Sequence, residues 1–320
     1  MVAYTSTSNS RDGSAVDTEP VTLSAKFRRF KPYRRIVNLA VNPPMLPMRS
    51  VAERRAVFRR LHESGCFVLP NPWDMGSARL LQHLGFQAVA STSSGSAWST
   101  GRPDYAVSRS DVLEHLSSLC NAIDLPVNAD FESGFADDPD GVGESVELAI
   151  GTGVAGLSIE DRDVAAAEKL YDLHTAIERV RVARMAIDRS GHNIILVART
   201  EGLLIDPRAV TPAIDRLVAF AEAGADCLYA PGVIDKGDIA AMVQAVAPKP
   251  VNVLMMRPGF RFSELAELGV RRISVGGGLA RVAYGAMINA AEQMRAGSFD
   301  GLAGAMQGKV LNEIFRAFEK

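Results

Sequence analysis

Residues 149–160 read AIGTGVAGLSIE, and this stretch contains one complete helix-to-strand joint. A helix end gives way to a Gly-Thr-Gly turn, and a short apolar run then stops at Glu160. The same joint recurs as LQHLGFQAVA at 81–90, AEAGADCLYA at 221–230 and AELGVRRISV at 266–275. Glycine is typical of such joints because it adopts the left-handed backbone that ends a helix. The repeated joint predicts that helices alternate with strands.

Eight short apolar segments extend this pattern along the chain. They are 66–73, 88–95, 126–134, 156–162, 194–201, 227–233, 250–256 and 271–278. Most of the intervening stretches are long enough for a helix, and strands joined through helices pair in parallel. Eight such units predict an α/β fold, a closed (β/α)8 barrel of the TIM type, whose chemistry lies at the carboxyl ends of the strands.

Charged side chains gather at these predicted strand ends. The set comprises Asp104, Asp130, Glu132, Glu160, Asp161, Arg199 and Glu201. Carboxylates that converge on one point raise each other's pKa, and a divalent cation is the usual compensation. Ligation by oxygen alone favours Mg²⁺ or Mn²⁺. Any single acid here fits a solvated turn as well, but the set as a whole predicts a metal site.

Composition limits the classes of partner. The net charge is −2 and 47% of the residues are hydrophobic, which suits a large core and argues against nucleic acid as a global partner. The chain has no run of about 18 apolar residues, so we expect no membrane partner. The three cysteines, Cys66, Cys120 and Cys227, lie in apolar settings that are typical of reduced thiols. A cytoplasmic protein is the expectation.

The segments around the barrel differ in character. We expect residues 1–48 to form a poorly ordered extension, and its basic segment 26–35 (KFRRFKPYRR) leaves a nucleic-acid or membrane arm as the alternative. Residues 49–300 form the predicted catalytic barrel. Within it, residues 49–64 predict a helix that closes the bottom of the barrel, with Arg54, Arg55, Arg59 and Arg60 mostly on the face away from the apolar one.

Residues 301–320 predict a final helix used for oligomerisation. An apolar stripe at helical spacing comprises Val310, Leu311, Ile314, Phe315 and Phe318. A stripe with two phenylalanines needs a covering surface. We expect the helix to pack on a neighbouring barrel in a homo-dimer or homo-tetramer, and packing on its own barrel is the alternative.

The motifs together resemble a known family. LPNPWDMGSARLLQHLGFQAVASTSSGSA at 69–97 is followed by GRPD at 101–104, an aspartate-bearing third strand, IEDR at 159–162, VARTE at 197–201 and EAGAD at 222–226. In order and spacing over about residues 60–295 this set is similar to the isocitrate lyase and phosphoenolpyruvate mutase superfamily. The resemblance implies a (β/α)8 barrel, a Mg²⁺ ion, and substrates that are small 2-oxo or 2-hydroxy carboxylic acids.

The resemblance also implies roles for individual residues. Ser94, Gly95 and Ser96 match the turn whose backbone N–H groups hold a substrate oxygen, and Arg199 matches the arginine that clamps the substrate carboxylate. A salt bridge to Glu201 or Asp161 is the alternative for Arg199. The residues that match the family's metal shell are Asp104, Asp130 and Glu160.

The sequence leaves open the roles of two further residues, Glu132 and Asn252. Glu132, two residues beyond Asp130, points to the same side of an extended chain and is a fourth metal candidate. Asn252 lies on the seventh predicted strand, where it hydrogen-bonds either to substrate or to a neighbouring loop.

Two departures from the family matter for the chemistry. Asn128 stands where the family has its first strand-three acid, so Asp130 and Glu132 form a variant acid pair. Residues 160–176 (EDRDVAAAEKLYDLHTA) lack the Lys-Lys-Cys-Gly-His loop of isocitrate and methylisocitrate lyases, whose cysteine is the catalytic acid. The lid is therefore predicted to be shortened or remodelled, and Asp163, Lys169 and Tyr171 remain as candidate proton donors.

These observations predict a Mg²⁺-dependent enzyme. Its leading reaction is cleavage of a C–C bond next to the carboxylate of a small 2-oxo or 2-hydroxy (di)carboxylic acid through an enolate. The alternatives are a C–P mutase or hydrolase acting on phosphonopyruvate-like substrates, and a barrel that binds an oxo acid without turnover.

Overall fold

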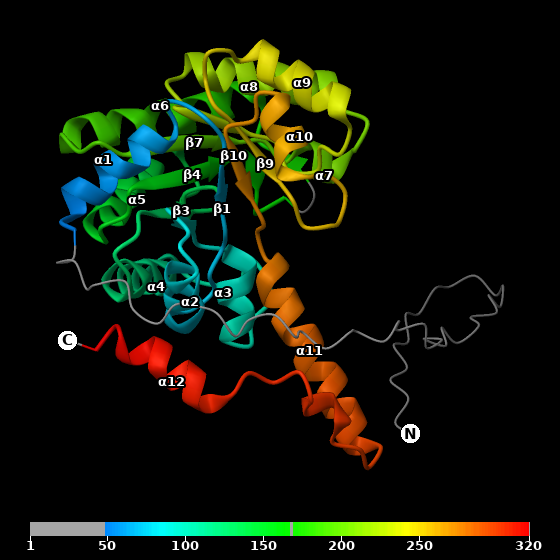
Figure 1. The fold of residues 1–320 in the computed structure, drawn as a ribbon. Coiled ribbons are helices and arrows are strands. Elements are labelled where there is room, and N and C mark those ends of the chain that lie inside the picture. The colour runs from blue at the N-terminus through cyan, green and yellow to red at the C-terminus, as the bar shows by residue number, and fades with distance from the viewer. Residues whose placement is uncertain (1–48, 167–168, 320) are drawn as a thin grey trace, which may run out of the picture. The chain divides into compact units, whose positions relative to one another are not determined.

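The computed structural model describes residues 49–166 and 169–319, so the extension predicted at 1–48 lies outside the described residues. Eight parallel strands form a nearly closed barrel (Figure 1). They are β1 Phe67–Leu69, β2 Val89–Ala90, β3 Val127–Asp130, β4 Gly156–Glu160, β7 Ile195–Arg199, β8 Cys227–Tyr229, β9 Val251–Leu254 and β10 Arg272–Ser274. Each predicted segment contains one of these strands, and the TIM-type fold is confirmed.

The barrel closes in chain order. The strands follow one another as β1-β10-β9-β8-β7-β4-β3-β2, which leaves β1 and β2 at the two edges of the sheet. A backbone hydrogen bond crosses this seam at 3.0 Å, from the Ala90 N–H to the Pro70 carbonyl. The carboxyl ends of all eight strands therefore face one mouth.

One helix, α1, precedes the first strand, and the other helices follow strands on the outside of the barrel or extend beyond it (Figure 1). They are α1 Val51–Leu61, α2 Met75–His83, α3 Ser93–Ser99, α4 Arg109–Ala122, α5 Pro139–Gly151, α6 Leu173–Ser190, α7 Gly202–Ile205, α8 Val210–Glu222, α9 Lys236–Ala245, α10 Phe262–Glu267, α11 Gly278–Arg295 and α12 Gly308–Arg316, with a short 3-10 turn at Asp300–Leu302. The predicted joints are confirmed, because positive φ angles end the preceding helices at Gly85, Gly153, Gly224 and Gly269.

Side chains alternate between the two faces of each strand. In β7, Leu196 and Ala198 join the core between strands and helices, whereas Ile195 and Val197 join a separate cluster inside the barrel. By this period of two, Arg199 points inward at the end of β7. The same parity turns Asp130 and Glu160 inward at the ends of β3 and β4. The fold therefore aims these three charged side chains at the mouth.

Helix α1 closes the opposite end of the barrel, as predicted. Phe58 is fully buried in the inner cluster, and a Cβ added to Gly156 would lie 2.7 Å from its ring. The prediction that Arg54 and Arg55 lie on the outer face is wrong, because both are buried. Arg54 donates to the Cys120 and Ile123 carbonyls, and Arg55 donates to those of Val154 and Ile150. These arginines satisfy carbonyls at helix ends, for which a long guanidinium stem is suited.

The chain ends in two helices outside the barrel. Figure 1 shows α11 (orange) extending away from the barrel and α12 (red) returning beside α2. In this single chain Ile314 is buried, and the Cζ atom of Arg79 on α2 lies 5.4 Å from the centre of the Phe318 ring. Exchange of α12 between subunits stays a prediction, as does the division at residue 300. Of the helices at 49–166 and 169–319, none is long and apolar enough to cross a membrane.

Candidate active site

A cavity of about 200 Å³ opens at the mouth of the barrel. Five of the residues singled out in the sequence line it, namely Ser94, Asp104, Asp130, Arg199 and Glu201. The cavity thus lies at the carboxyl ends of the strands, where enzymes with this fold carry out their chemistry.

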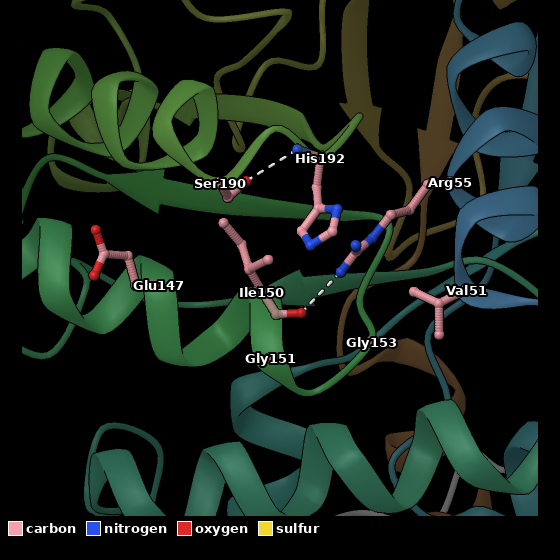
Figure 2. Close-up of a pocket in the computed structure, with 8 residues that line it drawn as sticks. All are labelled: Val51, Arg55, Glu147, Ile150, Gly151, Gly153, Ser190 and His192. Carbon is pink, nitrogen blue, oxygen red and sulfur yellow. Dashed lines mark hydrogen bonds between the residues drawn. The ribbon is translucent and has the colours of Figure 1, made fainter.

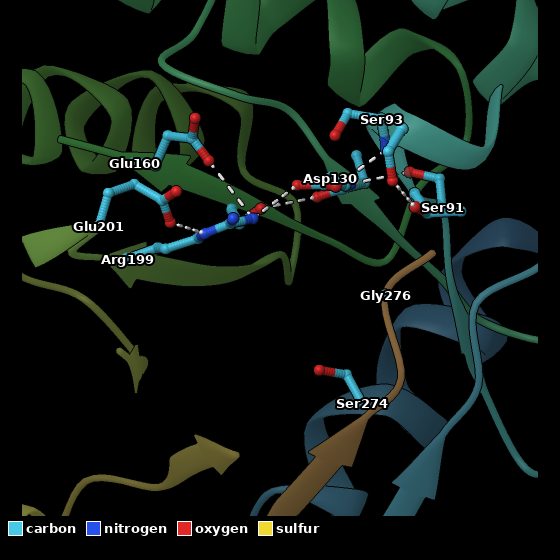
Figure 3. Close-up of polar contacts among 12 residues, drawn as sticks. Ser91, Ser93, Asp130, Glu160, Arg199, Glu201, Ser274 and Gly276 are labelled. Atoms are coloured by element: carbon cyan, nitrogen blue, oxygen red, sulfur yellow. Dashed lines mark hydrogen bonds and ion pairs between the residues drawn. The ribbon is translucent and has the colours of Figure 1, made fainter. Parts of the chain in front are cut away.

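Arg199 is the centre of a buried charge cluster (Figure 3). Its Nε donates to Glu201, and its Nη1 lies 3.3 Å from both Asp130 Oδ1 and Glu160 Oε2. The pairing of β4 with β7 sets Glu160 directly beside Arg199. Burial alone would lower the pKa of Arg199, but Glu201 and Glu160 more than offset this and hold the pKa well above its ordinary value. The guanidinium is therefore a permanent cation bound by the protein's own carboxylates.

This cluster bears on the predicted substrate clamp. The salt bridge to Glu201 that the sequence left as an alternative is present, and it uses the Nε of Arg199. Asp161, the other suggested partner, instead accepts hydrogen bonds from the Glu201 N–H and from Arg216. Arg199 still lines the cavity while holding its carboxylates, and its contact with a substrate stays a prediction.

Asp130 connects the cluster to the start of α3. Its Oδ2 accepts the Ser93 N–H at 2.9 Å, and its own N–H donates to Ser91 Oγ at 2.8 Å (Figure 3). The carboxylate at the N-terminus of α3 also lies at the positive end of the helix dipole. Asp130 is thus fixed on one side by α3 and on the other by Arg199.

The predicted Ser-Gly turn is the first turn of α3 and not the end of a strand. Thr92 caps this helix, and its Oγ1 accepts the Gly95 N–H at 3.3 Å. The Ser96 N–H donates to the Thr92 carbonyl, so both amides are used inside the helix. A Cβ at Gly95 would lie 2.6 Å from Thr92 Cγ2, which explains the glycine by packing. Of the three predicted residues, Ser94 alone lines the cavity among the described residues.

Three carboxyl groups beside Arg199 are the candidate metal donors. Burial, then the charges of Asp130 and Asp104, raises the pKa of Glu132 to about 8. Burial and the charge of Asp130 likewise raise the pKa of Asp104. A divalent cation would relieve this repulsion, so the donor chemistry fits Mg²⁺ or Mn²⁺. Among residues 49–166 and 169–319, however, no three acids, cysteines or histidines are arranged as a ligand cluster. Asp104 and Asp130 line the cavity, and Glu132 does not.

Glu160 lies behind the cavity wall rather than on it. It is 2% exposed, and its Oε1 accepts a hydrogen bond of 2.7 Å from the Tyr105 hydroxyl. Burial raises the pKa of Glu160 well above its ordinary value, against the opposing effect of Arg199. Glu160 therefore positions Tyr105 and Arg199, and its direct contact with a metal stays a prediction.

Tyr105 is a site residue that the sequence interpretation missed. It lines the cavity with its hydroxyl on Glu160, and the Arg162 guanidinium lies 4.6 Å from the centre of its ring. Its φ of 61° is rare for a residue with a side chain, and Glu132 has the same kind of angle at 47°. Such angles persist where surrounding contacts enforce them, and they cluster at functional sites. The available signal was its position directly after Asp104.

The floor of the cavity is a polar layer one step further down the strands. Arg272 lines the cavity and donates from Nε to Asn252 Oδ1 at 2.9 Å and from Nη1 to Asn128 Oδ1 at 3.3 Å. Asn252 also donates to Ser274 Oγ and does not itself line the cavity. These contacts fit the alternative, a buried amide that fixes its neighbours, and the suggested contact with substrate stays a prediction. Arg272 was also missed in the sequence.

The loop after β4, which the sequence predicts to be remodelled, contains two short antiparallel strands. Its strands are β5 Arg162–Asp163 and β6 Lys169–Leu170. The three candidate proton donors of this loop, Asp163, Lys169 and Tyr171, do not line the cavity among the described residues. Asp163 accepts backbone N–H groups within the hairpin, and the Tyr171 ring stacks with Arg179. Tyr105 is better placed than any of them.

A larger hollow of about 550 Å³ lies at the other end of the barrel (Figure 2). It is bordered by Val51 and Arg55 of α1 and by the turns that lead into β4 and β7. Arg55 there donates to the Ile150 carbonyl, and the His192 N–H donates to Ser190 Oγ. These hydrogen bonds pair polar groups at the ends of helices α5 and α6. The end of a TIM barrel opposite the mouth contributes stability rather than catalysis. The smaller cavity is the candidate active site.

Comparisons with known proteins agree with this geometry. The sequence model of a family described as phosphoenolpyruvate phosphomutase matches residues 58–295. An oxaloacetate decarboxylase of Pseudomonas paraeruginosa is 34% identical over 245 residues, which are 74% of this chain and 83% of the relative.

Solved structures give the same result. The crystal structure of a putative lyase/mutase from Burkholderia cenocepacia is 44% identical with a TM-score of 0.81, over 83% of this chain and 97% of that one. That of 2,3-dimethylmalate lyase is 28% identical with a TM-score of 0.73, over 84% and 95%. The chain belongs to the phosphoenolpyruvate mutase and isocitrate lyase superfamily.

Proposed function

We propose that this protein is a Mg²⁺-dependent lyase that breaks a C–C bond next to the carboxylate of a small 2-oxo or 2-hydroxy acid. The observation that carries the proposal is the group of Asp104, Asp130 and Glu132 around the mouth, next to Arg199, with two of these acids held at raised pKa. Relatives that cleave C–C bonds in oxaloacetate and dimethylmalate support it.

Asp104 and Asp130, with Glu132 behind them, are the residues that would hold the metal. When bound, the ion would polarise the oxo or hydroxyl oxygen of the substrate and stabilise negative charge that develops there. Burial raises the pKa of Glu160, Arg199 opposes this effect, and the guanidinium contributes its own positive charge at the wall of the cavity. Ser94, which lines the cavity in the first turn of α3, would orient the substrate oxygen.

In a 2-hydroxy acid, solvent at the mouth takes up the hydroxyl proton as the new carbonyl forms. In both classes of acid the electron pair of the broken bond stays on the carbon that separates from the new carbonyl carbon, and that carbon needs a proton. Tyr105 lines the cavity, and its hydroxyl donates a hydrogen bond to Glu160. Tyr105 is the proposed donor of this proton, and solvent at the mouth restores it. This assignment replaces the cysteine of the isocitrate lyases with a phenol from a different loop.

Substitution of Tyr105 by phenylalanine tests this role. The variant keeps the ring that stacks under Arg162 but loses the proton, so kcat is expected to fall by about 10²-fold with little change in KM. Steady-state kinetics of both proteins is the measurement. Tyr284, which lies on α11 and does not line the cavity, provides the matched Tyr→Phe control. An unchanged kcat in Tyr105→Phe would remove Tyr105 from the mechanism.

Metal binding is expected to release a proton near pH 7. In the metal-free protein the raised pKa of Glu132, about 8, keeps this carboxyl protonated at pH 7, and a cation needs the ionised form. Magnesium affinity therefore rises from pH 6 to pH 9 and then levels off. Calorimetry in two buffers of different ionisation enthalpy counts the protons. In Glu132→Gln the release at pH 7 disappears, and equal release from both proteins would contradict the assignment.

The same group makes stability depend on pH. Because the folded-state pKa of Glu132 is raised, its contribution to stability is complete below about pH 4.5 and is lost as the pH rises through 8. Metal-free Glu132→Gln should lose this part of the decline in stability between about pH 4.5 and pH 8.

Assembly as a homo-oligomer is the second part of the proposal. Helix α11 and the following turn expose apolar side chains, with Val282 and Phe299 each 70% exposed and Met287 59% exposed. A row of this kind is typical of an interface. Deletion of residues 305–320 is expected to give a monomeric or unstable protein, because Ile314 and Phe318 then leave their contacts. Light scattering that finds the full-size oligomer after deletion would contradict this.

A panel of substrates tests the reaction. Protein loaded with Mg²⁺ would be assayed with oxaloacetate, alkyl-substituted malates and phosphonopyruvate, with product detection by mass spectrometry. Cleavage of a member of the first two groups supports the proposal. Turnover of phosphonopyruvate alone would favour the C–P alternative, and binding without turnover would favour an oxo-acid-binding barrel.

A further inference from the structure

Arg272 is a buried cation in the floor of the cavity. It is 3% exposed and comes from β10, where the alternation of side chains turns it inward below Ser274. Both residues line the cavity. Figure 3 shows Ser274 on its strand across the open space from Arg199 and Asp130. Arg272 is therefore reached only through the cavity.

The immediate partners of Arg272 are neutral. They are the amide oxygens of Asn252 and Asn128 and, at 3.5 Å, the Nε2 atom of His62. Burial and the charge of Arg272 itself lower the pKa of His62 to about 3, so His62 adds no charge. Within residues 49–166 and 169–319, no carboxylate lies within 4 Å of Arg272. Its positive charge is thus unpaired.

The other two arginines of the cavity differ from Arg272. Arg199 is already held by Asp130, Glu160 and Glu201. Arg162 lies at the half-exposed rim, where it stacks on Tyr105 and is accessible to water. An unpaired charge taken from water costs several kcal/mol, and a well-placed counter-ion recovers much of this cost. Among these three residues Arg272 has the strongest physical need for an anion.

Asn128 explains how the charge stays unpaired. An aspartate at this position would face Arg272 Nη1 at 3.3 Å and would form an ion pair with it. The amide holds the guanidinium in place by the same contact but leaves its charge uncompensated. Asn128 and Arg272 therefore act together. The amide positions the guanidinium, and the positive charge of the guanidinium stays available to a ligand.

We propose that Arg272, with Ser274 beside it, is a subsite that binds the second oxyanion group of a small dianionic substrate. The first anionic group lies at the mouth beside Arg199, an assignment that rests on the proposed function. Arg199 contacts Asp130 and Arg272 contacts Asn128, two residues earlier on β3. That step along a strand is roughly 7 Å, which suits the two ends of a three- or four-carbon diacid.

Binding measurements test the subsite without requiring turnover. The ligands are malonate, with two carboxylates, phosphonoacetate, with a carboxylate and a phosphonate, and acetate as the matched monoanion. Calorimetric titrations with Mg²⁺ present compare the wild-type protein with Arg272→Met. The control is Arg271→Met, which changes the neighbouring arginine that donates to the Gly65 carbonyl outside the cavity. Circular dichroism establishes that each variant is folded.

A second variant covers the case in which Arg272→Met does not fold. Asn252→Asp keeps the shape of the amide and the arginine, and it sets a negative charge at the oxygen that accepts the Arg272 Nε at 2.9 Å. Asn252 does not line the cavity, so the charge pairs with Arg272 without touching a ligand. The new carboxylate should neutralise the charge of Arg272. This variant should therefore lose the preference for dianions although it keeps the guanidinium.

The wild-type protein and Arg271→Met are expected to bind at least one dianion about 10- to 150-fold more tightly than acetate, the range for hydrogen bonds to charged groups. Asn252→Asp and folded Arg272→Met are expected to reduce this ratio to about threefold or less, with acetate binding nearly unchanged. The dianion that binds more tightly shows whether the second group is a carboxylate or a phosphonate. A preference retained in folded Arg272→Met or in Asn252→Asp, or absent in the wild type, would overturn the proposal. An Arg272-dependent preference without C–C cleavage would refute the proposed function alone.

Discussion

Replacement of Asp130 by asparagine is expected to lower kcat/KM by roughly 10³-fold while the protein stays folded. Among the described residues, Asp130 is the one acid that combines three features. It lines the cavity, accepts the Ser93 N–H at the start of α3 and contacts Arg199. An asparagine that keeps its side-chain oxygen toward the Ser93 N–H turns its NH₂ group toward the Arg199 guanidinium. Both of these groups are hydrogen-bond donors, so they cannot bond to each other. The variant thus loses both the charge and the link between α3 and Arg199.

Steady-state kinetics measures the loss of kcat/KM, and thermal unfolding shows whether the variant stays folded. Asp140→Asn, an exposed acid in the first turn of α5, is the matched control and should keep its activity. Near-native turnover by Asp130→Asn after metal chelation would show that the carboxylate cluster is not the catalytic centre.

Replacement of Arg199 by methionine is expected to lower the free energy of unfolding by about 3–5 kcal/mol and to abolish activity. Glu160 and Glu201 are 2% and 1% exposed, and without the guanidinium they share a buried space with Asp130 and no counter-ion. The carboxyls then have to take up protons or draw in water, and either response disrupts the wall of the cavity.

Denaturant unfolding at neutral pH measures this effect. Arg189→Met removes an exposed ion pair with Glu147 and should change stability by less than about 1 kcal/mol. Arg199→Lys keeps the charge but cannot bridge three carboxylates, so a loss of kcat/KM of about 10- to 150-fold is expected. A methionine variant as stable as the wild type would show that the cluster contributes little to the fold.

The fold could be predicted from the sequence because two independent signals coincide. Glycine joints such as Gly153 end the helices, and short apolar segments such as 194–201 supply the strands. A period of two then fixes which side chains point inward, and this places Asp130 and Arg199 at the mouth. These are local properties of the chain, so no knowledge of distant contacts was needed.

The remainder of the site depends on contacts that sequence spacing does not encode. The role of Arg272 depends on Asn128, which is 144 positions away, and on the absence of an acid from that layer. Tyr105 reaches Glu160 only because its backbone takes an unusual positive φ. Thr92 caps α3 and converts a predicted strand end into a helix start. The buried arginines of α1 follow from carbonyls at the ends of other helices, which helical periodicity alone does not reveal.

The most direct test of the central claim is a time course by NMR in D₂O, with Mg²⁺-loaded protein and the acids of the substrate panel. Cleavage through an enolate predicts that the carbon which keeps the electron pair of the broken bond appears in the product with one deuterium, and that Asp130→Asn forms this product roughly 10³-fold more slowly. Substrates that remain intact, or a product formed without deuterium at that carbon, would contradict the assignment of this barrel as a C–C lyase.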